Sequence, residues 1–148
     1  MNERVDLAAA ERVINAARKR AEKIGQPMNI AVVDAGARLV AFARMDKAIL
    51  ASIDISIKKA ETAMMLKLPT GAIGELSQPG QPLYGIEHTN GGLVTFPGGL
   101  PLLDADGETV GAIGVSAGSV EEDHDVASAG AAAFLAKPRA GGRRTVAT

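Results

Sequence analysis

The chain has 148 residues, of which 47% are hydrophobic and 22% charged, so it is long enough for one domain with a substantial core. Its 16 basic and 17 acidic residues give a net charge of −1, which argues against nucleic acid or an anionic membrane surface as a partner. No cysteine is present, which excludes disulfides and thiolate-ligated metal or haem. With neither a membrane-spanning apolar run nor a secretory signal pattern, the expected location is cytoplasmic.

The first predicted elements are a helix and a β-hairpin. Apolar residues recur at helical spacing over 7–24, and Gly25 and Pro27 are typical of a helix end. Two β-prone runs then flank an Asp-x-Gly turn at 34–36, which predicts a hairpin. A turn of the same kind at 104–107 predicts a second hairpin of similar design late in the chain.

A second helix is expected between the hairpins, over 49–68. Its packed stripe is predicted to consist of Ile49, Ile53, Ile57, Ala60 and Met64. Further apolar residues widen this surface beyond one stripe, which indicates burial on two sides or contact with another subunit. The glycine- and proline-rich segment 71–99 predicts an ordered loop that walls a pocket, with one short strand around 93–96.

The last predicted element is a helix that begins after Ser119. Ser119 and Glu122 have the spacing of a capping box, and Ala129, Gly130 and Ala133 belong to a small-residue face. The predicted fold class is therefore α+β: an antiparallel sheet of about five strands flanked by helices, in the order α-β-β-α-loop-β-β-α. We expect a single domain over 1–137 and a disordered basic tail over 138–148.

Seven short motifs, in this order, resemble those of the GlcG/HbpS-like family of haem-binding and haem-degrading-domain proteins, which includes PduO C-terminal-type domains. They are AVVDAG (31–36), LVAFARMD (39–46), KAETA (59–63), PLYG (82–85), FPGGLP (96–101), GAIGVS (111–116) and EED (121–123). The resemblance covers about residues 5–136. It implies a profilin-like sandwich, homo-oligomers, haem binding in some members, and corrinoid, diol or glycolate metabolism in others. The family usually continues as Ser-Gly-Gly where this chain has Ser116-Ala117-Gly118.

His88 and His124 are the only histidines. His88 lies in the glycine-rich loop, where it could ligate haem iron or another metal or act as an acid–base catalyst; the alternative is an ordinary surface histidine. His124 follows Glu121 by three positions on the predicted helix, so the two could hold a divalent cation together. The alternative is that the acidic first turn only stabilises the helix dipole.

The other candidates are ligand-binding residues. Arg44 and Lys59 would suit a haem propionate or a small organic acid, whereas Asp46 could instead form a structural ion pair with either of them. Gly98 and Gly99 could bring backbone N–H groups to an anion, or could form only a tight turn. Two further candidates are Thr62, one turn after Lys59, and Tyr84 in the loop.

We hypothesise that the loop at 82–101 and the start of the last helix face one cavity, which brings His88 or His124 near Arg44 or Lys59. Three functions remain open. The first is a homo-oligomeric protein that binds haem or a related tetrapyrrole, with a redox or degradative side activity. The second is a cofactor-light or metal-dependent enzyme of small organic acid or alcohol catabolism that uses the same pocket. The third is an accessory module for corrinoid or diol metabolism.

Overall fold

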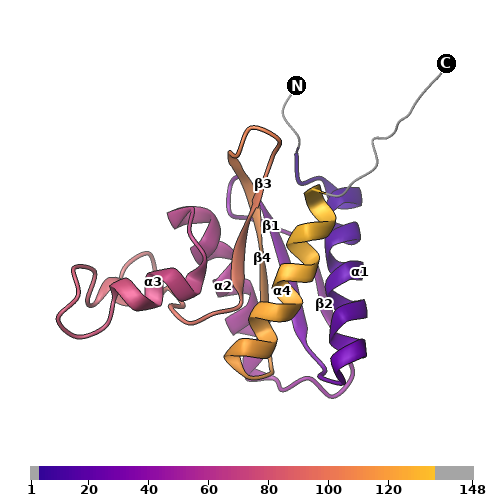
Figure 1. The fold of residues 1–148 in the computed structure, drawn as a ribbon, viewed down its shortest axis with the longest axis horizontal. Coiled ribbons are helices and arrows are strands. Elements are labelled where there is room, and N and C mark those ends of the chain that lie inside the picture. Colours follow the sequence, from indigo (N-terminus) through magenta and orange to yellow (C-terminus); the bar gives the residue numbers. More distant parts are fainter. Residues whose placement is uncertain (1–3, 136–148) are drawn as a thin grey trace.

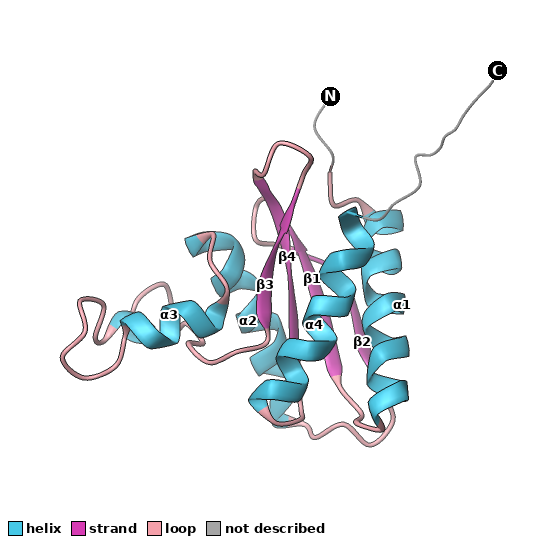
Figure 2. Cartoon of the chain, in the orientation of Figure 1, coloured by secondary structure: helices cyan, strands magenta, loops and turns pink. Residues whose placement is uncertain are grey.

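The computed structural model describes residues 4–135 and has a four-stranded sheet between helices (Figures 1 and 2). The helices are α1 (Leu7–Ile24), α2 (Ala51–Leu66), α3 (Thr70–Leu76) and α4 (Val120–Leu135), with a short 3₁₀ helix η1 (Ile86–His88). The strands are β1 (Asn29–Asp34), β2 (Leu39–Arg44), β3 (Gly99–Leu103) and β4 (Thr109–Ser116). The predicted α+β class is confirmed.

The expected count of about five strands is wrong, because residues 93–96 form no strand. The backbone N–H of Leu93 donates to the carbonyl of Glu87 in the same loop, and that of Val94 donates to the side chain of Thr62 on α2. These donors therefore bond to a loop and a helix, so this segment adds no rung to the sheet.

The sheet is antiparallel throughout, in the order β2-β1-β4-β3. Helices α1 and α4 lie side by side on one face and α2 covers the other, while α3 and the loop after it project away from the sheet (Figures 1 and 2). Because the central strands β1 and β4 are covered on both faces, their residues are almost all buried. The outer strands β2 and β3 are only partly buried.

The two hairpins have the similar design that their turns predict. In each, Oδ1 of an aspartate accepts from the backbone N–H groups two and four residues later, at 2.9 and 3.1 Å for Asp34 and at 2.9 and 3.0 Å for Asp104. In each, the residue three positions after the aspartate is left-handed: Ala37 at φ 60° and Gly107 at φ 82°. The first hairpin thus has an alanine where the second has the less strained glycine.

The predicted stripe of α2 is confirmed at Ala60 and Met64, which are buried, and wrong at Ile49, which is exposed. The buried residues of this helix are Ser52, Ser56, Lys59, Ala60, Thr62, Ala63 and Met64, whereas Ile53 and Ile57 are half-buried and Ile49 is exposed. The reason lies in β4, where Gly114 has no side chain between the sheet and the helix backbone. A Cβ at Gly114 would meet the Ser56 carbonyl and the Ala60 backbone nitrogen, so α2 packs through small and polar residues at very short range.

Helix α4 begins with the predicted capping box. The Glu122 N–H donates to Ser119 Oγ at 3.1 Å, and the Ser119 N–H donates to Glu122 Oε1 at 2.9 Å. Of its small-residue face, Gly130 is buried, and a Cβ there would lie 2.5 Å from Ile113 Cδ1 and 3.3 Å from Ala17 Cβ of α1, whereas Ala129 and Ala133 are half-buried. Gly130 therefore lets α4 pack closely against α1 and β4.

The predicted basic tail, 138–148, lies outside the described residues, as does the predicted domain boundary at 137. Within residues 4–135, none of the helices combines the length and the apolar character needed to cross a bilayer.

Ala117 adopts φ 136°, a conformation that suits glycine. We expect Ala117→Gly to raise the free energy of unfolding by about 1 kcal/mol. Relief of about 1–3 kcal/mol of strain is partly offset by the greater backbone entropy of glycine in the unfolded chain. Denaturant unfolding measures this, with Ala132→Gly on the exposed side of α4 as a control that should lose about 1 kcal/mol. A destabilised Ala117→Gly variant would contradict the strain.

Candidate functional site

Lys59 lies at the centre of the packed face of α2 and is completely buried. Its Nζ donates to the carbonyl of Val115 on β4 at 2.8 Å and to Asp123 Oδ2 on α4 at 2.9 Å. The ring of Phe96 lies 5.0 Å from the same nitrogen, within the range of a cation–π contact. One ammonium group thus joins α2, the end of the glycine-rich loop, β4 and α4.

Asp123 is the partner that this buried cation requires. Its side chain is 3% exposed, and its second oxygen, Oδ1, accepts from the Gly118 N–H at 2.9 Å. The carboxylate therefore binds Lys59 and also holds the turn that leads from β4 into α4. Asp123 was absent from the predicted site; a lysine on a helix face of small residues was the sequence signal for a buried counter-charge.

Gly98 and Gly99 let the loop pass close to this pair. A Cβ at Gly98 would lie 2.5 Å from both Lys59 Nζ and the Val115 carbonyl oxygen, and Gly98 has φ 127°. The Gly99 N–H donates to Thr70 Oγ1 at 2.9 Å, so this amide has a protein partner already. The alternative reading of the glycine pair, as a tight turn, fits these contacts better than an anion-binding nest.

Burial shifts the pKa of both members of the pair toward the neutral forms. Loss of hydration lowers the pKa of Lys59, and the hydrogen bond and charge of Asp123 oppose this change. Loss of hydration likewise raises the pKa of Asp123, opposed by the hydrogen bond and charge of Lys59 and by the Gly118 amide. The attraction between the two groups therefore opposes the effect of burial on both.

His124 follows Asp123 but faces outward, into an apolar groove of about 390 Å³ between α3, the loop at Pro97 and the start of α4. The lining residues are Pro69, Gly71, Ala72, Glu75, Pro97, Val120, Glu121 and His124. The expected contact between the glycine-rich loop and the start of the last helix is thus present. His88, Arg44 and Lys59 are not among the lining residues, so of these predicted groups only His124 faces the groove, although Lys59 bonds to the neighbouring Asp123.

The remaining candidates are scattered. His88, Arg44 and Asp46 are exposed, and Tyr84 is 68% exposed. Thr62 is buried, and its Oγ1 accepts from the Val94 N–H at 3.2 Å, which is a structural contact. The expected ion pair of Asp46 with Lys59 or Arg44 is wrong, since Lys59 pairs with Asp123, and within residues 4–135 neither Arg44 nor Asp46 forms an ion pair.

A predicted metal site at His88, His124 and Glu121 gains no support. Over the described part of the chain, no three His, Cys, Asp or Glu residues lie close enough to hold a metal ion together. His124 and Glu121 line the same groove, but two ligands alone do not make a protein metal site.

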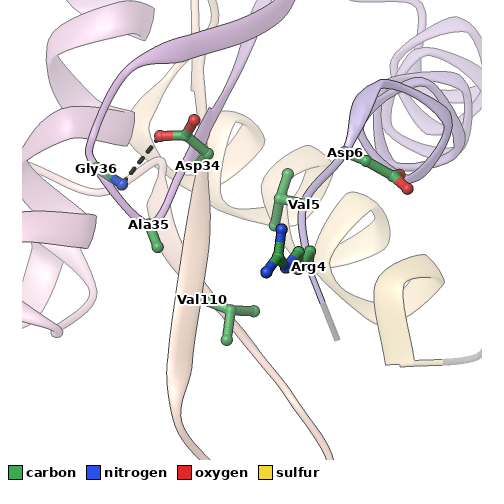
Figure 3. A pocket seen from close by; sticks show the side chains of 7 residues that line it. All are labelled: Arg4, Val5, Asp6, Asp34, Ala35, Gly36 and Val110. Carbon is green, nitrogen blue, oxygen red and sulfur yellow. Dashed lines mark hydrogen bonds between the residues drawn. The ribbon is translucent and has the colours of Figure 1, made fainter. Parts of the chain in front are cut away.

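Figure 3 shows another hollow, of about 420 Å³, beside the β1–β2 turn. The Arg4 guanidinium points into it next to Val110, whereas the Asp34 carboxylate turns toward the Gly36 amide. Asp6 also lines the hollow, but its Oδ1 accepts from the Ala9 N–H at 2.8 Å and caps α1. Both carboxylates thus serve local backbone structure.

The family model described as "Haem degrading protein HbpS-like" matches residues 5–132. The chain belongs to the HbpS-like family. The match includes α2, the glycine-rich loop, β4 and the start of α4, and therefore the whole Lys59–Asp123 cluster.

This HbpS-like chain is similar to two bacterial proteins and to one crystal structure. It is 42% identical over 120 residues to an uncharacterized 15.0 kDa protein of the dhaT-dhaS intergenic region of Citrobacter freundii, covering 80% of this chain and 84% of that protein. It is 41% identical over 120 residues to the corrinoid adenosyltransferase PduO of Salmonella typhimurium, covering 80% of this chain but 35% of PduO. The crystal structure of a PduOC:haem complex superimposes with a TM-score of 0.80 at 38% identity, covering 85% of this chain and 91% of the other.

The Lys59–Asp123 pair yields a test by mutation and pH. We expect Asp123→Asn to lower the free energy of unfolding by about 3–5 kcal/mol at pH 7, because it leaves a buried cation without its counter-charge. Without the carboxylate the pKa of Lys59 falls further below its ordinary value of 10.5. Between the lowered pKa and 10.5 the unfolded chain binds more protons than the native one, so stability of this variant should rise with pH.

The control is the double variant Lys59→Met/Asp123→Asn, which has no buried amine to titrate. It should be more stable than Asp123→Asn alone, and its stability should not show the additional rise with pH. Urea unfolding between pH 6 and 10 measures both variants. If the free energy of unfolding of Asp123→Asn rises with pH no more steeply than that of the double variant, this would contradict a charged Lys59 in the core.

Proposed function

We propose that this HbpS-like protein binds haem, and that His124 is the residue that ligates the iron. The observation that supports this is the position of His124: an exposed imidazole at the wall of an apolar groove, in a chain 38% identical to PduOC, whose haem complex is known. Histidine is a common axial ligand of haem iron, and cysteine is absent from this chain.

The groove residues fit such a ligand. The volume of about 390 Å³ lies in the range of ligand sites, and Pro69, Ala72, Pro97 and Val120 offer apolar surface to a flat ring. When bound, haem would supply an iron centre for redox chemistry. The chain's own contribution is the His124 nitrogen, whose orientation is fixed by the first turn of α4, where Asp123 is bound to Lys59.

Two carboxylates at the groove restrict how a haem would lie. Glu75 and Glu121 both line it, and no lysine or arginine does. Carboxylates repel the negatively charged propionates, so these would extend into solvent while the apolar ring edge enters the groove. The expected propionate partners Arg44 and Lys59 therefore have no part in this proposal.

A haem titration tests the proposal. The wild-type protein should give a saturable shift of the Soret band, and His124→Ala should weaken binding by about tenfold or more, equal to about 1.4 kcal/mol, because the iron loses its axial nitrogen. His88→Ala is the matched control, since it removes the other imidazole, and it should bind like wild type. Circular dichroism verifies that each variant is folded. Equal binding by wild type and His124→Ala would assign the iron to another residue.

A homo-oligomer is the second part of the proposal. Around α2, the large apolar side chains of Ile49, Leu50, Met65 and Leu68 are 59%, 71%, 42% and 37% exposed. Ile49 and Leu50 precede α2 and Met65 and Leu68 lie at its other end, so a second copy of the chain that packs along this helix would cover them.

Light scattering at tens of micromolar should therefore give a mass at least twice the 15.2 kDa of the chain. Ile49→Glu/Leu50→Glu should reduce that mass, because it places charge on the surface to be buried, whereas Leu7→Glu at an equally exposed site on α1 should leave it unchanged. A wild-type mass of one chain would refute this part.

The remaining predicted functions have less support. A role beside a corrinoid enzyme stays a prediction, because the matched region is 35% of PduO. Degradative activity also stays a prediction. Among the lining residues of the His124 groove, only Glu75 and Glu121 have titratable side chains besides His124 itself.

A further inference from the structure

A second cavity lies apart from the His124 groove, where the β1–β2 turn, the end of α2 and the glycine-rich loop meet. Its volume is about 520 Å³, a size typical of small-molecule sites. The turn residues Ala35 and Gly36, drawn in Figure 3, also line this cavity, and none of its lining residues lines the groove of His124.

The charges at this cavity favour a small anion with one negative charge. Arg38 from the turn and Lys67 from the end of α2 supply two cations, and Glu61 supplies one carboxylate. Within residues 4–135, none of these three side chains takes part in an ion pair. The guanidinium therefore keeps its paired donors available, and such donors match the two oxygens of a carboxylate.

Three residues at this cavity have left-handed backbone. Ala37, Lys67 and Asn90 line it, and their φ angles are 60°, 57° and 54°. Left-handed backbone disfavours alanine and lysine, and the equivalent of Ala37 in the second hairpin is Gly107. Lys67 is the C-cap that ends α2 and Ala37 closes the hairpin turn, so these conformations determine where the chain places Lys67 and the neighbouring Arg38.

The remaining wall is apolar and adaptable. Met64 is almost buried, and Met65 is 42% exposed. Thioether side chains adjust to irregular apolar shapes, so they suit the body of a ligand whose charged end is bound elsewhere. We propose that this cavity binds a small monocarboxylic acid with a short apolar body, with the carboxylate on Arg38 and Lys67 and the body on the methionines.

Butyrate is the probe, and ¹⁵N–¹H NMR of the whole chain is the measurement. Saturable shifts are expected at the amides of the turn, of the end of α2 and of residue 90. Arg38→Gln should weaken binding by about tenfold, because a charge-assisted hydrogen bond is lost, and Lys67→Gln should weaken it several-fold. Lys19→Gln, which removes an exposed charge on α1, is the matched control and should bind like wild type.

Two other probes separate the alternatives. Butylammonium has the same apolar body with the opposite charge, and it should cause no saturable shift at these amides. Inorganic phosphate has charge without an apolar body and should bind more weakly than butyrate; equal or tighter binding of phosphate would overturn the organic-acid assignment. An equal loss of butyrate binding in Lys19→Gln and Arg38→Gln, or no shifts at these amides, would overturn the site itself. His124→Ala should leave butyrate binding unchanged, so this result is independent of the proposed haem function.

Discussion

The buried ion pair between Lys59 and Asp123 is the interaction on which the arrangement of the site depends. The two residues are 64 positions apart, and their contact links the helix on one face of the sheet to the first turn of the helix on the other. A cation in a core is tolerated only with compensating partners, and Val115 and Asp123 accept two hydrogen bonds from it while the Phe96 ring lies 5.0 Å away. The loop at Phe96 and Gly98 packs directly against the Lys59 ammonium group.

The outward direction of His124 follows from the same ion pair. Asp123 is held inward, so the next residue on α4, His124, points toward the groove. The backbone just before the helix is held by Asp123 through Gly118, and Gln26 Nε2 donates to the Ala117 carbonyl at 3.2 Å. These contacts maintain Ala117 in its unfavourable conformation, because the surrounding hydrogen bonds determine the path of the chain.

Local chemistry made much of the fold predictable. The two hairpins and the capping box depend on residues within five positions of one another, so the pattern at Asp34, Asp104 and Ser119 was sufficient. The packed face of α2 was predictable only at Ala60 and Met64, since the burial of polar residues such as Ser56 depends on Gly114, far along the chain. The site was predictable only in part. The loop and His124 meet as expected, but the pairing of Lys59 with Asp123 depends on how α2 and α4 pack against the sheet, which the sequence pattern does not show.

The strand order also determines how the sheet can meet other chains. A sheet that is not closed exposes unpaired backbone donors and acceptors along its two outer strands, and these can template further strands. Pro101 interrupts the donors of β3, which is a common protection of an edge. β2 contains no proline, and Leu39 on it is 49% exposed. β2 is therefore the edge that is less protected against pairing with a strand of another chain.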